Sequence, residues 1–150
     1  MQAATIEVSA DLAEWERIRQ FLASYCESNS ISGATCKSMQ LACEEWFINV
    51  VVHGFKNGAK GAGEPPYICL SLSLGGSGEI RAVLTDNATP FNPLEHETPD
   101  ISLPVADRSI GGLGIYLMLK QAERAAYRQT EGKNELTLWF KIRQDEQTGE

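Results

Sequence analysis

The clearest pattern in the chain is an alternation of apolar and polar residues, which predicts β-strands. In "YICLSLSL", residues 67–74, Ile68 and every second residue after it are apolar, and serines fall between them. After the turn "GGSG", the segment "EIRAVLTD", residues 79–86, returns along the first, so the two segments predict a β-hairpin. "ATIEVS", residues 4–9, predicts a further short strand, and "AAYRQT" with "ELTLWFKI" predicts a second hairpin around "EGKN".

Apolar residues three and four positions apart predict helices in the remaining long segments. Asp11 is the expected N-cap of a helix that reaches about Tyr25. A second helix is expected from about Ala34 to Phe55, and a third begins at the glycines of "GGLGIYLMLKQAERA". Residues 87–109 have no clear period. A connection of more than about 20 residues is long for a compact domain, and such loops often act as lids.

This order of elements predicts an α+β fold. Strand, two helices, hairpin, long loop, helix and hairpin fit a two-layer sandwich, in which a mixed, mostly antiparallel sheet carries the helices on one face. The length of 150 residues suits one domain with a real core. We expect residues 1–150 to form this single domain, ordered over about 4–142, with 143–150 as a disordered tail.

Composition and charge narrow the function classes. A net charge of −7 with no basic run argues against binding to nucleic acid, which needs clustered Lys and Arg. No segment approaches the roughly 20 apolar residues of a membrane span, and the N-terminus lacks the pattern of a signal peptide. The four cysteines form no CxxC pair and are expected to be reduced and packed as small apolar side chains. These observations predict a cytoplasmic protein.

A row of polar residues crosses the otherwise apolar segment "CEEWFINVVVHGF", residues 43–55. Glu45, Asn49 and His53 recur at every fourth position. Four residues advance a helix by about 400°, so the three side chains would fan over roughly 80° of one face. The amide oxygen of Asn49 could ligate Mg²⁺, and the carboxylate of Glu45 could accept a proton from a hydroxyl that attacks a bound phosphate. Alternatively, the row is satisfied by hydrogen bonds to neighbouring elements.

Two further sites lie beside structural breaks. Asp86 ends a predicted strand, where its carboxylate could accept from an exocyclic amine such as that of adenine, or could simply form an Asx-turn. Gly111, Gly112 and Gly114 stand where a helix begins, and the free N–H groups there could bind phosphate. The alternative is a glycine-rich turn that serves close packing. The spacing matches neither the dinucleotide fingerprint nor the P-loop.

The order of these motifs resembles the histidine-kinase-like ATPases and, within them, the family of anti-sigma factor serine/threonine kinases. "EEWFINVVVHGF" resembles their N-box, "DNATPFNP" their first glycine box, "GGLGIYLMLK" their second, and "GKNELTLWF" their closing strand. The resemblance covers roughly residues 4–142. It implies a kinase that uses ATP and Mg²⁺ to phosphorylate a Ser or Thr of an anti-anti-sigma-type partner, and a protein that can also sequester a sigma factor. It also suggests a homodimer formed through the sheet or its first strand.

The resemblance implies a role for each matching residue. Glu45 would be the general base, Asn49 the Mg²⁺ ligand, His53 a neighbour of the phosphate or ribose end, and Asp86 the residue that reads the adenine amine. Glu44 adjoins Glu45, but only Glu45 stands four residues before Asn49. The cofactor-binding set also includes the stretch that would shape the end of the lid against the phosphates, namely Gly111, Gly112, Leu113 and Gly114. Arg108, a cation just before these glycines, is a further candidate for reaching the phosphates.

Ala88 departs from the family pattern, in which the first glycine box usually reads Asp, any residue, Gly. Glycine permits a positive φ and close backbone approach, so the methyl group of Ala88 could crowd the adenine and weaken nucleotide binding. An alternative function is therefore a binding module of the same fold that sequesters a partner with weak or no kinase activity. A detached sensor-kinase ATPase domain is a further alternative, although the chain lacks a phosphoacceptor-histidine helix pair.

Overall fold

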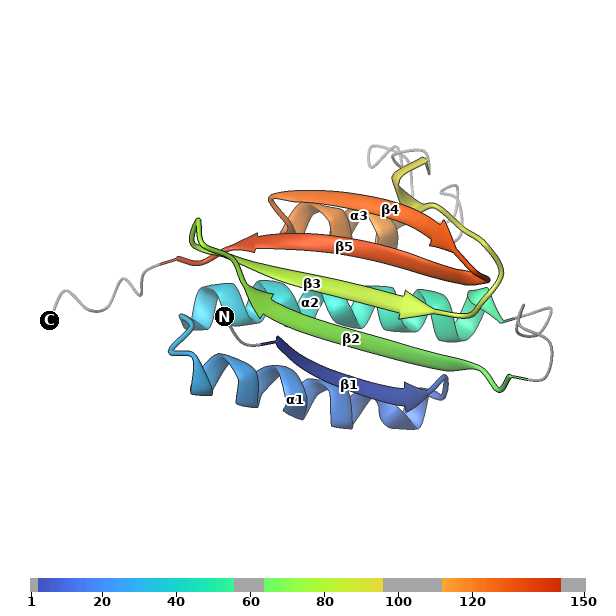
Figure 1. The fold of residues 1–150 in the computed structure, drawn as a ribbon, viewed down its shortest axis with the longest axis horizontal. Coiled ribbons are helices and arrows are strands. Elements are labelled where there is room, and N and C mark those ends of the chain that lie inside the picture. Colours follow the sequence, from blue (N-terminus) through green and yellow to red (C-terminus); the bar gives the residue numbers. More distant parts are fainter. Residues whose placement is uncertain (1–2, 56–63, 96–111, 144–150) are drawn as a thin grey trace, which may run out of the picture.

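The computed structural model describes residues 3–55, 64–95 and 112–143, and it has two layers (Figure 1). One layer is a five-stranded sheet, and the helices cover one face of it. The strands are β1 (Ala3–Ser9), β2 (Tyr67–Leu74), β3 (Glu79–Asp86), β4 (Arg124–Thr130) and β5 (Lys133–Lys141). The helices are α1 (Trp15–Ser28), α2 (Gly33–Asn49) and α3 (Gly112–Gln121). The predicted α+β two-layer fold is confirmed.

The sheet has the strand order β1-β2-β3-β5-β4. Both predicted hairpins, β2–β3 and β4–β5, are confirmed, and the predicted first strand pairs with β2. All four pairings between the described strands are antiparallel, so the parallel part of the expected mixed sheet is not found among them. The register places Leu70 opposite Leu84 and Leu84 opposite Leu136, which aligns apolar side chains in a row across the sheet.

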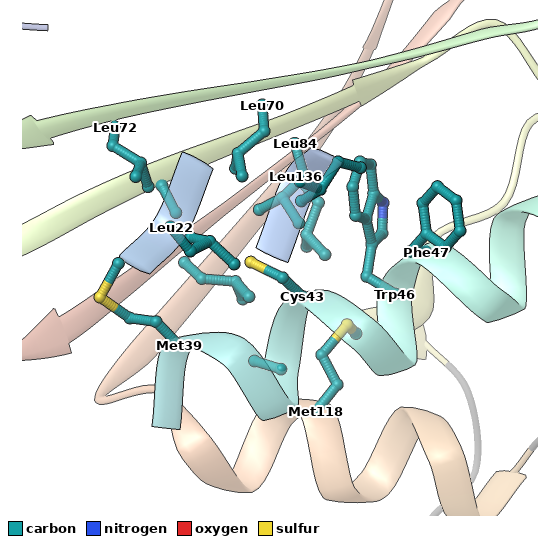
Figure 2. Close-up of a cluster of buried hydrophobic side chains, with 14 of the residues drawn as sticks. Leu22, Met39, Cys43, Trp46, Phe47, Leu70, Leu72, Leu84, Met118 and Leu136 are labelled. Carbon is teal, nitrogen blue, oxygen red and sulfur yellow. The ribbon is translucent and has the colours of Figure 1, made fainter. Parts of the chain in front are cut away.

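The core lies between this row and the helices. The buried cluster contains Met39, Cys43 and Phe47 of α2 together with Leu70 and Leu84 of the sheet, and all five side chains are fully buried (Figure 2). The three α2 residues recur at every fourth position, which places them on one side of the helix. The apolar pattern of the sequence therefore marks the side of α2 that is buried in the core. Burial of the larger of these side chains contributes about 1.5–3 kcal/mol each before entropic costs.

Side-chain hydrogen bonds cap the N-terminal ends of the first two helical segments. Asp11 accepts from the N–H of Ala13 at 2.9 Å, as expected for a cap, but it begins a 3₁₀ turn that precedes α1. Helix α1 then continues past the expected end at Tyr25 to Ser28. Ser32 accepts from the N–H of Thr35 at 3.2 Å and thereby caps α2.

The expected continuous α-helix from about Ala34 to Phe55 is wrong in its last turn. The α-helix ends at Asn49, and residues Val50–Gly54 form a π-helical turn. A π turn is wider than an α turn, because its hydrogen bonds span five residues, and such turns are often found at functional sites. Sequence periodicity could not distinguish the two, because both place apolar residues against the sheet.

The cysteines agree with the expectation from the sequence. The four cysteines are unpaired, and burial raises the pKa of the Cys43 thiol to about 12, as expected for a thiol that packs as an apolar group. Among the described residues, no helix has the length and apolarity that crossing a membrane requires.

Candidate active site

The described residues enclose a cavity of about 430 Å³ beside the C-terminal half of α2, which is within the usual size of small-molecule sites. Its walls come from α2, the π turn, α3, strands β4 and β5, and the segment that follows β3. Glu45, Asn49 and His53 all line it, as do Asp86 and Ala88. The row on the helix and the end of the strand, which are separate in the sequence, are therefore brought together, as the motif analysis requires.

The polar row spans two kinds of helical turn. Glu45 and Asn49 lie on α2, one α turn apart, whereas His53 lies in the π turn. Four residues advance an α-helix by more than a full turn, by about 400°. The π turn advances less per residue, so the three side chains do not follow the fan of about 80° that a regular helix would give.

Glu45 lies against the first turn of α3. A Cβ added to Gly114 would come within 2.8 Å of Glu45 Oε1, so a side chain at this position would displace the Glu45 carboxylate. Burial raises the pKa of the Glu45 carboxyl, and the negative charge of Glu44 adds to this effect. A carboxylate with a raised pKa is a better proton acceptor near neutral pH, which is the property of a general base.

Asp86 is deeply buried, and one of its oxygens is held by the protein. Oδ1 accepts from the N–H of Ala88 at 3.0 Å and from the side-chain amide of Asn134 at 2.9 Å. Burial raises the pKa of the Asp86 carboxyl, and these two donors oppose the rise. The bond from Ala88 is the expected Asx-turn, and Asp86 also lines the cavity, so the turn is compatible with a ligand-binding role, which stays a prediction.

Ala88 fits beside a glycine of the π turn. A Cβ added to Gly54 would lie 2.9 Å from Ala88 Cβ, and the N–H of Thr89 donates to the carbonyl of Gly54 at 3.2 Å. Among the described non-glycine residues only Ser30 and Glu131 have a positive φ, so the backbone of Ala88 is in an ordinary region. The Ala88 methyl group therefore fills space above Gly54 without backbone strain.

The structure describes only some of the candidate residues around the second glycine box. Gly112 is the first residue of α3, and Gly114 lies in its first turn. Arg108, Gly111 and the side chain of Leu113 lie outside the described residues, so their expected roles remain predictions.

Sequence reasoning missed Asn134 and Tyr127, which also line the cavity. Asn134 is the second residue of β5 and follows closely on a turn, where asparagine is ordinarily a turn residue, and Tyr127 follows the apolar alternation of β4. The Tyr127 hydroxyl donates to Asn134 Oδ1. Nothing local in the sequence distinguishes this pair, because its partner Asp86 is 48 residues from Asn134.

The comparisons with known proteins agree with the fold. A family model described as "Histidine kinase-like ATPase domain" matches residues 8–140. The search among curated proteins found no match. The crystal structure of the RsbU and RsbW domains of Rv1364c from Mycobacterium tuberculosis matches with a TM-score of 0.66 at 15% identity, over 97% of this chain and 34% of that chain. This chain thus spans about a third of that structure's length, and at this identity the likeness concerns the fold alone.

A second solved structure is more distant. The histidine kinase domain from the Erythrobacter litoralis EL346 blue-light activated histidine kinase matches with a TM-score of 0.49 at 11% identity, over 87% of this chain and 60% of that chain.

The contact between Gly54 and Ala88 predicts a coupled pair. Gly54→Ala should lower the free energy of unfolding by about 1–3 kcal/mol, because its new methyl group meets the Ala88 methyl group at 2.9 Å. Ala88→Gly in the same chain should recover most of this loss, with a coupling energy of about 0.5–3 kcal/mol. Urea denaturation of the two single variants and the double variant measures it. Gly33→Ala is the control, since a Cβ there meets no atom within 4 Å. Additive effects at the pair would contradict the contact.

The buried Asp86 carboxyl predicts a pH-dependent gain in stability when its charge is removed. Because its pKa is raised on folding, this group favours the folded state below its unfolded-state pKa and loses that contribution as the pH rises through the folded-state pKa. Asp86→Asn should therefore melt at a higher temperature than the wild type at pH 7, and the gap should shrink at pH 4. Thermal melts of both proteins at the two pH values measure it, and a gap that widens at pH 4 would refute the raised pKa.

Proposed function

The chain belongs to the histidine kinase-like ATPase domain family, and on this premise we propose that it is an ATP-dependent serine/threonine protein kinase. The observation that carries the proposal is the shared cavity of Glu45, Asn49 and Asp86. Phosphoryl transfer from ATP can use all three groups. Asp86 is a buried acceptor for an amine, Asn49 offers an amide oxygen for a hard cation, and Glu45 is a carboxylate with a raised pKa.

The residues present fit MgATP. Among the described residues, no cluster of three or more His, Cys, Asp or Glu could hold a metal ion by itself. This suits Mg²⁺, which is usually bound by one or two protein oxygens, its own waters and the phosphates of a substrate. Asn49 would contribute the protein oxygen, and Mg²⁺ would supply positive charge next to the phosphates. Asp86 would accept a hydrogen bond from the adenine amine, and His53 would lie toward the phosphate or ribose end.

Glu45 would act as the general base. It would accept the proton of a Ser or Thr hydroxyl, whose oxygen forms a bond to the γ-phosphorus as the bond to the leaving ADP breaks. The glycine at position 114 leaves the carboxylate room beside α3. Its partial burial raises the pKa of the Glu45 carboxyl toward the working pH, which favours proton transfer.

The partner that we propose is an anti-anti-sigma-type protein, together with or in place of a sigma factor that the chain would sequester. The motif resemblance supports this choice. A cytoplasmic location and a homodimer belong to the same proposal. The alternative, a binding module without kinase activity, was favoured by Ala88. Its support weakens because Ala88 fits above Gly54 with ordinary backbone geometry.

Calorimetric titration with ADP and ATP, with and without Mg²⁺, tests the site. We expect binding that is strongest with Mg²⁺. Asn49→Ala should weaken binding of MgATP by roughly tenfold or more, the size expected when a polar contact to a charged group is lost. Ile48→Ala is the matched control on the same helix, because Ile48 is 40% exposed. Absence of binding at millimolar nucleotide would exclude the kinase and favour the binding module.

Phosphoryl transfer is tested separately through Glu45. Glu45→Gln keeps the shape of the side chain but cannot accept the proton, so it should bind MgATP normally and transfer phosphate about 10²–10⁴-fold more slowly. The transfer is measured by mass spectrometry of a purified anti-anti-sigma domain that has been incubated with MgATP and either the wild-type protein or the variant. Unchanged transfer by this variant would remove Glu45 from the reaction.

A further inference from the structure

Asn134 connects three elements around the cavity. Its Nδ2 lies 2.9 Å from Asp86 Oδ1, 3.1 Å from the carbonyl of Thr89 and 3.3 Å from the carbonyl of Ala88. Its Oδ1 accepts from the N–H of Phe91 at 3.1 Å and from the Tyr127 hydroxyl. The side chain thus ties the end of β3, the segment after it and strand β4 to the start of β5.

These contacts fix which way the amide faces. A side-chain amide offers two N–H donors and an oxygen with two lone pairs, and Asn134 uses both sides fully. If the amide were reversed, its oxygen would face the Asp86 carboxylate and two carbonyls, and its NH₂ would face the Phe91 N–H. Only one orientation satisfies the partners, so a donor always points at Asp86.

The consequence for Asp86 is that one carboxylate oxygen is occupied and the other is left for a ligand. The bonds from Ala88 and Asn134 both end on Oδ1, and no described residue donates to Oδ2. Asp86 is 3% exposed and lines the cavity, and Oδ2 is the oxygen that receives no donor from the described residues. A donor at Oδ1 also stabilises the charged carboxylate, which only accepts hydrogen bonds.

We propose that Asn134 is a positioning residue that makes the cavity selective for purines with a six-position amine over purines with a carbonyl there. This inference rests on the proposed function, because it concerns the base that the same cavity binds. An acceptor-only Oδ2 pairs with the amine of adenine and repels the carbonyl of hypoxanthine or guanine. Without the Asn134 donor, Asp86 can take up a proton and rotate, and a protonated carboxyl donates to a carbonyl as readily as it accepts from an amine.

The test compares ATP with ITP, which differ at the base edge and carry the same ribose and triphosphate. We expect wild-type protein with Mg²⁺ to bind ATP more tightly than ITP in calorimetric titrations. Asn134→Ala should reduce the ratio of the two affinities by about tenfold, mainly through weaker ATP binding. Gln129→Ala should leave the ratio unchanged, because this exposed residue lies opposite Asn134 in the β4–β5 pairing without contacting Asp86.

A second variant covers the case in which the alanine variant does not fold. Asn134→Asp is nearly the same size but places a second acceptor against Asp86, so it should also lose the preference for ATP. Equal weakening of ATP and ITP in both variants, or an unchanged ratio, would overturn this inference and leave the proposed function standing. Failure of the wild-type protein to bind either nucleotide would overturn both.

Discussion

The contact between α2 and the sheet determines where every other candidate residue can lie. Met39, Cys43 and Phe47 are fully buried in the cluster that lies between α2 and the sheet, which fixes both the rotation and the position of the helix (Figure 2). A helix that buries one side must present another side to its neighbours. Glu45 and Asn49 lie on the flank of this buried face, and the flank forms a wall of the cavity.

Two glycines allow the surrounding elements to approach this wall closely, and each glycine lies next to a different chemical group. Gly114 lets α3 pass the Glu45 carboxylate, and Gly54 lets the segment after β3 place the Ala88 methyl group on the π turn. In both places a side chain on the glycine would collide with its neighbour at less than 3 Å. These elements border a cavity of about 430 Å³ that Glu45, Asn49 and Asp86 line.

The cavity is lined by two carboxyl groups, Asp86 and Glu45, whose ionisation the fold disfavours on balance. Burial raises the pKa of both Asp86 and Glu45, so each ionised carboxylate costs folding free energy near neutral pH. Neither has an ion-pair partner among the described residues, where the four ion pairs are Arg17–Glu14, Arg19–Glu16, Arg124–Glu79 and Arg128–Glu135. Perturbed and unpaired carboxyls in a cavity are typical of a functional site, where ligand contacts offset the cost.

The sequence by itself determined the strands, the helices and most of the candidate site. Alternation and helical spacing predicted all five strands and three helices, because these periods record which side chains of one segment face the core. The row from Glu45 and the strand end at Asp86 were predictable for the same local reason. Only the tertiary structure decided four other features. These are the π turn, the placement of β5 between β3 and β4, the contact of Ala88 with Gly54, and the hydrogen bond from Asn134 to Asp86. Each of these depends on a distance between segments far apart in the chain, and no local pattern of residues encodes such a distance.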